Sequence, residues 1–123
     1  MRTHNAKLAT SYSSDNGMTW TDVVLTDIPS NQSGTDAVTL RDGRHILIYN
    51  NFETLPNEPK GPRTPLSLAI SDDGIHWRHL LTLEDSPTGE FSYPAIIEGR
   101  DGTLHCTYTW RRERVAYKQV KLK

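Results

Sequence analysis

The sequence contains two copies of one segment, and this internal repeat constrains the fold more than any other feature of the chain. Residues 8–20 reappear in outline as residues 66–77, with their tryptophans 57 positions apart. Further along the chain, residues 36–49 match residues 93–108, with their Asp-Gly pairs 59 positions apart. The repeating unit is therefore about 57 residues long, and a chain of 123 residues holds about two of them.

Each unit has the pattern of short β-strands. Runs rich in Ile, Val, Leu, Thr and Tyr are bounded by Asp-Gly, Asn-Gly or Pro, and no segment keeps a helical apolar spacing over a helical length. Residues 42–43 and 101–102 are Asp-Gly pairs, which suit tight hairpins because a type I′ turn needs positive φ at both central residues. Strands are expected at residues 6–13, 21–26, 36–40, 44–50, 66–71, 77–83, 94–98, 103–110 and 114–122.

Four antiparallel strands repeated at this period indicate blades of a β-propeller, so the predicted fold class is all-β. Residues 1–26 would supply the third and fourth strands of one blade, residues 27–83 a complete blade, and residues 84–123 the first three strands of another. A propeller closes its ring to remove exposed strand edges, which takes at least four blades. We therefore expect either a piece of a longer protein or self-association as a trimer or dimer. Self-association is favoured because two blades bury little surface.

Composition excludes several classes of function. Fourteen Lys and Arg against fifteen Asp and Glu give a net charge of −1, so no global field attracts nucleic acid or an anionic membrane. The apolar runs are too short to span a bilayer, and the first residues lack the apolar stretch of a secretory signal, so we expect a soluble chain of unknown compartment. Cys106 is the single cysteine, and the five histidines show no ligand-spaced pair, so neither a metal nor a cofactor is expected.

Residues Ser13-x-Asp15-x-Gly17-x-Thr19-Trp20 match the Asp-box, a turn motif that joins the third and fourth strands of a propeller blade. Asp and Ser side chains can accept hydrogen bonds from the turn's own backbone, and Gly supplies a positive φ. The Trp can pack beneath the turn and pin it to the sheet. The motif is therefore expected to be structural.

The second copy of the motif is degenerate. Asp72, Gly74 and Trp77 keep the register of the first copy, while Ile70 and His76 stand where Ser and Thr are expected. With its flanking strands, the chain resembles the C-terminal part of the propeller of a bacterial sialidase-like protein of the BNR/Asp-box repeat group. The resemblance is also carried by residues 31–38, 50–51, 63–66, 92–95 and 107–112.

The strand order sorts the loops between the two ends of the blades. Both Asp-boxes and both Asp-Gly hairpins share one end, and the long loops 26–35, 50–65 and 84–92 share the other. Long loops held on a rigid scaffold commonly carry function. Residues expected near this common rim are Asp36, Asn50, Asn51, Arg63, Glu90, Tyr93 and Trp110.

The resemblance implies a glycoside hydrolase of sialidase type that acts on sialic-acid-type or other acidic glycans. In that family an axis-facing Tyr is the nucleophile, and Tyr93 matches its place; the alternative is that Tyr93 plugs the central channel. Arg63 resembles an arginine that grips the substrate carboxylate, or is an exposed loop arginine. Glu90 would activate Tyr93, or is a solvated loop glutamate.

Five further residues are expected to contact substrate. Asp36, placed at the repeat position of Tyr93, would contact the ligand or cap a turn, and Asn50 and Asn51 end a strand at the same rim. Trp110 and Arg111, together with the following arginine, would stack on a sugar or recognise its acid group, or would form an exposed strand end.

Two functions follow for the chain, and both have a carbohydrate ligand as partner. The first is a segment of a sialidase-type hydrolase, inactive by itself because the strands that carry the family's Arg-Ile-Pro motif, acid/base Asp and remaining arginines have no counterpart here. The second is a carbohydrate-binding propeller module without catalysis, assembled as a homo-oligomer.

Overall fold

The computed structural model describes residues 1–55, 58 and 60–123, so three positions of the predicted 50–65 loop (56, 57 and 59) lie outside the described residues. The described chain contains β-strands joined by turns and loops. The strands are β1 (Lys7–Thr10), β2 (Val24–Pro29), β3 (Asp36–Thr39), β4 (His45–Asn50), β5 (Leu66–Ser71), β6 (Arg78–Glu84), β7 (Phe91–Glu98), β8 (Thr103–Trp110) and β9 (Arg114–Lys121).

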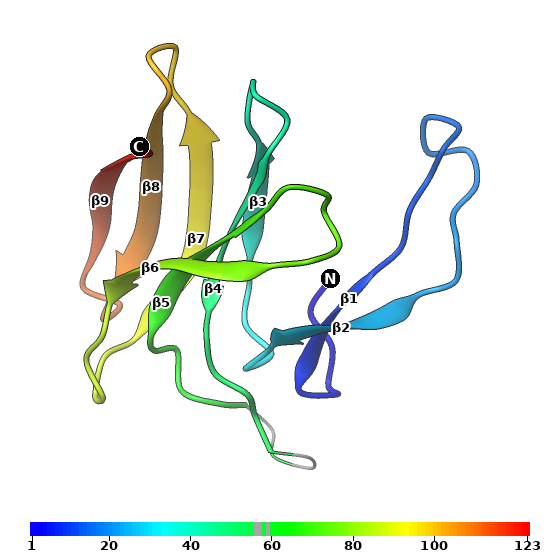
Figure 1. Cartoon of the computed structure of the whole chain (residues 1–123). Helices are drawn as coiled ribbons and strands as arrows, with labels where there is room; N and C mark the ends of the chain where they lie inside the picture. The colour runs from blue at the N-terminus through cyan, green and yellow to red at the C-terminus, as the bar shows by residue number, and fades with distance from the viewer. Residues whose placement is uncertain (56–57, 59) are drawn as a thin grey trace.

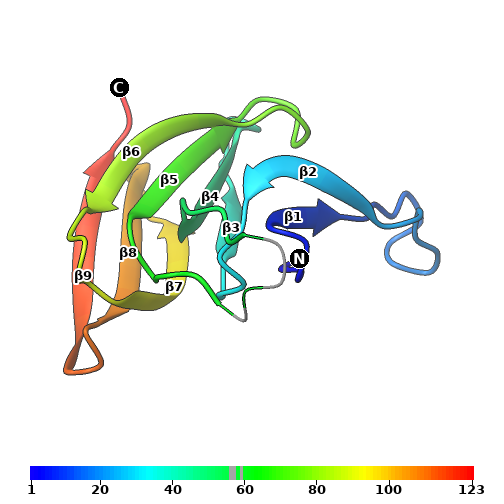
Figure 2. The same ribbon diagram turned by 90° about the horizontal axis from the view of Figure 1, so that it is seen from below.

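These strands form three antiparallel sheets, which confirms the all-β prediction. We call them the two-stranded sheet (β1-β2), the middle sheet (β3-β4-β5-β6) and the three-stranded sheet (β7-β8-β9). The sheets follow one another in space as they do in sequence (Figures 1 and 2). In Figure 1 the first Asp-box segment and the β3–β4 and β7–β8 turns lie at the upper end, and the β4–β5 and β6–β7 loops lie at the lower end. This is the separation of loops that the strand order predicts.

Three strands differ from the prediction by three residues at one end or both. β1 ends at Thr10 instead of residue 13, and β2 ends at Pro29 instead of residue 26. β2 starts at Val24 instead of residue 21, because Thr21 closes the preceding turn: its backbone N–H donates to the Tyr12 carbonyl and its hydroxyl accepts from the Tyr12 N–H. β7 starts at Phe91 instead of residue 94, because the strand continues on both sides of an irregularity between Ser92 and Ala95.

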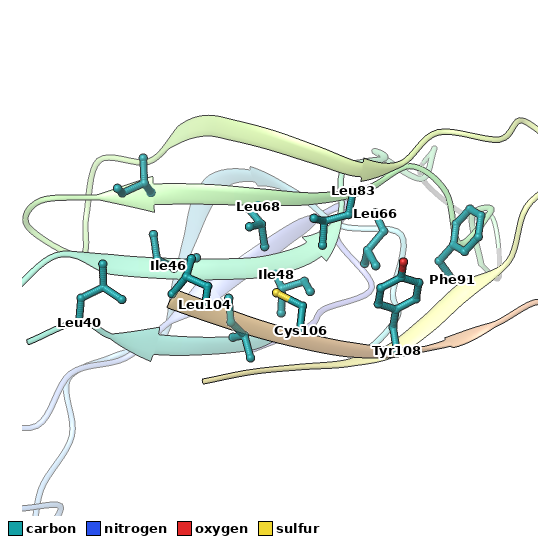
Figure 3. Packing of buried hydrophobic residues seen from close by; sticks show 12 residues of the cluster. Leu40, Ile46, Ile48, Leu66, Leu68, Leu83, Phe91, Leu104, Cys106 and Tyr108 are labelled. Carbon is teal, nitrogen blue, oxygen red and sulfur yellow. The ribbon is translucent and has the colours of Figure 1, made fainter. Parts of the chain in front are cut away.

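The two inner strands of the middle sheet, β4 and β5, are buried on both faces. Side chains alternate between the faces of a strand, and in β4 Ile46 and Ile48 join a cluster with the three-stranded sheet, while Leu47 and Tyr49 join a cluster with the two-stranded sheet. Figure 3 shows the first cluster, in which side chains of the two sheets meet. The buried members of that cluster are Leu40, Ile46, Ile48, Leu66, Leu68, Ile70, Leu83, Phe91, Ile96, Leu104, Cys106 and Tyr108.

A polar contact also joins the middle and three-stranded sheets. The hydroxyl of Tyr108 in β8 donates to Glu84 Oε1 at 2.5 Å, and Lys118 Nζ of β9 lies 3.1 Å from the same oxygen. Burial, and next the Glu84 contact, raise the pKa of Tyr108 well above its usual range. The hydroxyl therefore stays protonated and acts as the donor that links the two sheets.

Within the described ranges, no helix has the length and apolar character needed to cross a membrane. In the same part of the chain, no group of three or more His, Cys, Asp and Glu side chains is arranged to hold a metal ion.

Candidate functional site

The first Asp-box closes the two-stranded sheet through its own side chains. The Ser13 hydroxyl accepts from the Gly17 N–H at 2.8 Å, and Asp15 accepts from the backbone N–H and hydroxyl of Thr19 at 2.8 and 2.5 Å. The Trp20 indole donates to the Gly17 carbonyl at 3.1 Å. These hydrogen bonds, with the Thr19 hydroxyl the largest contributor, lower the pKa of Asp15 to about 2.

The second Asp-box repeats these contacts with Asp73 in the place predicted for Asp72. The Ser71 hydroxyl accepts from the Gly74 N–H at 2.8 Å, and Asp73 accepts from the His76 N–H at 2.8 Å and pairs with His76 Nδ1 at 2.6 Å. The Trp77 indole donates to the Gly74 carbonyl, as in the first box. The prediction for Asp72 is thus corrected, because the second box is one residue shorter between its Asp and Gly.

Asp72 instead lies 2.8 Å from Arg78 in an exposed ion pair. The box serine that the sequence comparison missed is Ser71, which donates to Asp73 as Ser13 donates to Asp15. The sequence signal for this serine is the Ser-x-Asp spacing at residues 71–73, which matches residues 13–15. When the two copies are aligned on their tryptophans, Ser13 falls opposite Ile70 and the match is lost.

Tyr93 lies at the opposite end of the sheets from the Asp-boxes. It falls in the β7 irregularity, has a φ of 51°, and is 73% exposed. The prediction that Asp36 and Tyr93 occupy the same repeat position is wrong. Asp36 pairs with Ile48, and the residue 59 positions after Ile48, Thr107, pairs with Ala95, so Ala95 is the counterpart of Asp36. One extra residue in β7 sets Tyr93 outside the regular strand.

Arg63 lies over the ring of Tyr93. Its guanidinium carbon is 5.4 Å from the ring centroid, within the range of a cation–π interaction. The Arg63 carbonyl accepts from the Phe91 N–H at 2.9 Å, which fixes the β4–β5 loop against the start of β7. The structure therefore brings together the predicted nucleophile and the predicted carboxylate anchor.

Glu90 lies between two arginines. Its Oε1 is 3.9 Å from Arg63 Nη1 and accepts from Arg112 Nε at 2.7 Å. Its carbonyl accepts from the Arg111 N–H at 2.7 Å. Glu90 thus connects the β4–β5 loop to the β8–β9 turn.

Trp110 lies beside the same rim and has cations on its ring. Arg111 and Arg114 lie 4.8 and 4.1 Å from the ring centroid, and Arg111 Nη2 donates to Ser86 Oγ at 3.4 Å. The substrate-binding roles of Trp110 and Arg111 stay predictions.

The remaining residues predicted to contact ligand make hydrogen bonds within the protein. Asn50 is 2% exposed; its amide donates to the Phe91 carbonyl at 3.0 Å and its oxygen accepts from the Ser33 hydroxyl at 2.7 Å. The Asn50 side chain therefore connects the loops from inside, and ligand contact by it stays a prediction. Asp36 accepts from the Ile96 N–H at 2.9 Å, and the Asn51 N–H donates to a backbone carbonyl. Ligand contact by these two residues stays a prediction.

Comparison with solved structures shows the fold. The leech intramolecular trans-sialidase, in a complex with 2,7-anhydro-Neu5Ac, aligns over 98% of this chain and 21% of its own, with 19% identity and a TM-score of 0.73. The Ruminococcus gnavus intramolecular trans-sialidase, in a complex with oseltamivir carboxylate, aligns over 98% and 29%, with 21% identity and a TM-score of 0.74. A Streptococcus pneumoniae sialidase aligns over 98% and 21%, with 19% identity and a TM-score of 0.74.

The chain spans less than a third of the length of these three proteins, and their likeness confirms the predicted sialidase-type propeller fold of the segment. No curated protein matches the chain. Residues 1–106 match the family described as BNR repeat-like domain, which covers most of the sequence. The chain therefore belongs to the BNR repeat-like domain family, as a segment of a sialidase-like propeller.

Proposed function

We propose that this chain provides one part of the binding site of a sialidase-type glycosidase, namely the end of the sheets that carries Arg63, Glu90 and Tyr93. We propose that this rim recognises acidic glycans of the sialic-acid type. The observation that carries the proposal is the Arg63 guanidinium held 5.4 Å over the exposed ring of Tyr93. A guanidinium matches the two oxygens of a carboxylate. A neutral phenol can approach a carbon that bears such a carboxylate without charge repulsion, which suits Tyr93 to the nucleophile's place.

Turnover is proposed only for a longer assembly. The chain covers 21% to 29% of the sialidase-type proteins that it matches. General acid catalysis needs a further side chain placed on the leaving group, and the resemblance puts that residue on strands that have no counterpart here. For the chain alone we propose glycan recognition without robust hydrolysis.

The three sheets are proposed to be parts of successive blades. The predicted divisions after residues 26 and 83 fall inside β2 and β6, so we place the boundaries after Pro29 and Glu84. Self-association into a dimer or trimer is a separate proposal, supported by large apolar side chains that are exposed on the outer sheets: Val24, Leu25, Ile97 and Val115. A solution mass of one chain would contradict it.

A fluorogenic sialoside tests both parts of the functional proposal. We expect saturable binding of the sialoside, weakened at least about tenfold by Arg63→Ala, because one charge-assisted contact is removed. We expect no enzyme-like release of the fluorophore. Absence of binding would overturn recognition, and rapid hydrolysis that Tyr93→Phe abolishes would overturn the claim that the chain alone is inactive.

A further inference from the structure

Of the six non-glycine residues with a positive φ in the described part of the chain, three lie together on the rim. Tyr93, Arg111 and Arg112 have φ values of 51°, 52° and 57°, in the left-handed region that residues other than Gly, Asn and Asp seldom adopt. Arg111 and Arg112 follow one another in the turn between β8 and β9, where tight hairpins ordinarily use Asn-Gly. Strained residues of this kind cluster at ligand sites, where the surrounding structure holds them.

The Glu90 side chain lies between the guanidinium groups of Arg63 and Arg112. The β4–β5 loop meets it through Arg63, whose Nη1 is 3.9 Å from Glu90 Oε1, and the β8–β9 turn meets it through Arg112 Nε at 2.7 Å. Backbone hydrogen bonds flank it on both sides, from the Phe91 N–H to the Arg63 carbonyl and from the Arg111 N–H to the Glu90 carbonyl. One carboxylate therefore connects three segments that are distant in sequence.

The contacts of Glu90 do not suit a base for Tyr93. A general base lies within hydrogen-bond reach of the proton that it takes, and among the described residues the Glu90 side chain bonds to Arg112 and not to the Tyr93 hydroxyl. Its Oε1 faces both guanidinium groups. A carboxylate in this position balances the two cations and holds them close together.

We propose that Glu90 is a positioning residue, which fixes the Arg63 guanidinium over the Tyr93 ring and Arg112 beside it, so that Arg112 is a second cation for the acid group of the sugar. This inference rests on the proposed function. Two guanidinium groups and one carboxylate leave one net positive charge, which complements a sugar with a single carboxylate.

The electrostatics of Arg112 agree with this arrangement. The hydrogen bond to Glu90 raises the pKa of Arg112 above its ordinary value, and the Tyr93 side chain contributes in the same direction. Arg112 therefore stays charged, close to both groups.

The positioning role is tested without ligand, by NMR of the Arg63 Nε–Hε group. An aromatic ring shifts protons held over its face, so the Arg63 signal should be displaced in the natural chain and should lose the displacement in Tyr93→Leu. Glu90→Gln should also lose it, while Glu113→Gln, at an exposed glutamate of the neighbouring turn, should keep it. An unchanged Arg63 signal in Glu90→Gln overturns the positioning role.

Ligand titrations separate this inference from the proposed function. With N-acetylneuraminic acid, Glu90→Gln and Arg112→Ala should each weaken binding about tenfold, while affinity for the neutral methyl ester stays unchanged. An equal loss for acid and ester means that Glu90 supports only the fold, and unchanged acid binding in both variants overturns the inference. If the natural chain does not bind the acid, the proposed function fails, and so does the ligand role of Arg112. The positioning role of Glu90 is then still tested by the NMR signal of Arg63, which needs no ligand.

Discussion

The middle sheet and the three-stranded sheet place different residues at the same strand positions. Ile46 stands four residues after the Asp of its hairpin, is fully buried and faces the three-stranded sheet; His105 holds the same position in the next repeat and faces outward. Leu68 in the middle sheet likewise corresponds to Tyr117. On this outer face, the hydroxyl of Tyr117 contacts His105 Nδ1 at 2.6 Å and accepts from Gln119 at 2.7 Å.

This difference teaches that burial comes from the neighbouring sheet and not from the strand scaffold. Where a sheet is covered, as at Ile46 and Leu68, the repeat carries apolar side chains. At the corresponding positions of the uncovered face, His105 and Tyr117 join a hydrogen-bonded network beside the exposed side chains of Ile97 and Val115. The middle sheet thus holds the structure together, and the outer face of the three-stranded sheet contributes little to it.

The largest effect that we expect comes from Leu68→Ala. Leu68 is fully buried between two sheets, so its truncation should lower the free energy of unfolding by about 2–5 kcal/mol. The matched control is Tyr117→Ala at the equivalent outer position, for which we expect about 1 kcal/mol or less. Urea unfolding of both variants measures the difference, and equal losses would show that the outer face is covered after all.

A smaller effect is expected from removing the hydroxyl that links the two sheets. Tyr108→Phe takes the donor away from Glu84 in a partly buried contact, which should cost about 1–2 kcal/mol in the free energy of unfolding. Tyr117→Phe removes a hydroxyl from the opposite face of the same sheet, where water can replace it, and should cost about 0.5 kcal/mol or less. Chemical unfolding compares them, and a reversed order would contradict the contrast between the two faces.

The smallest effect concerns the two neighbouring aspartates of the second Asp-box. Hydrogen bonds, with the His76 side chain the largest contributor, hold the pKa of Asp73 well below its usual 3.8. The stabilisation is therefore present above pH 3.8 and is lost as the pH falls through the lower folded value. Asp73→Asn should lower the thermal midpoint at neutral pH and flatten its decline in acid.

Asp72→Asn is the control for that variant, because its exposed ion pair with Arg78 contributes little to stability. Its thermal midpoint should follow the natural chain at every pH. If Asp72→Asn had the larger effect, the assignment of the box to Asp73 would be wrong.

Much of the fold could be predicted because the repeat, the Asp-Gly turns and the first Asp-box are local signals. The predicted strand at 103–110 was confirmed without change, since regular alternation defines it. The errors lie where one residue is gained or lost. The second box has one residue fewer between its Asp and Gly, so Asp73 and not Asp72 accepts its hydrogen bonds, and one extra residue in β7 takes Tyr93 out of the register of Asp36. A motif search with a fixed spacing does not detect the insertion or deletion of a single residue.

The candidate site was harder to predict because its geometry depends on contacts between segments distant in sequence. Arg63 and Tyr93 are 30 residues apart, and only the resemblance linked them before the structure placed the guanidinium over the ring. Nothing in the local sequence shows that Glu90 faces Arg63 and Arg112. The burial of Asn50 follows in the same way from contacts with Ser33 and Phe91.

The central claim is that the rim recognises a carboxylate through Arg63, and calorimetric titration tests it most directly. N-acetylneuraminic acid and its methyl ester are each titrated into the natural chain and into Arg63→Ala. The account predicts that the natural chain prefers the acid by about tenfold or more and that Arg63→Ala loses most of this preference. Equal affinity for acid and ester in the natural chain, or a preference that survives in Arg63→Ala, would contradict it.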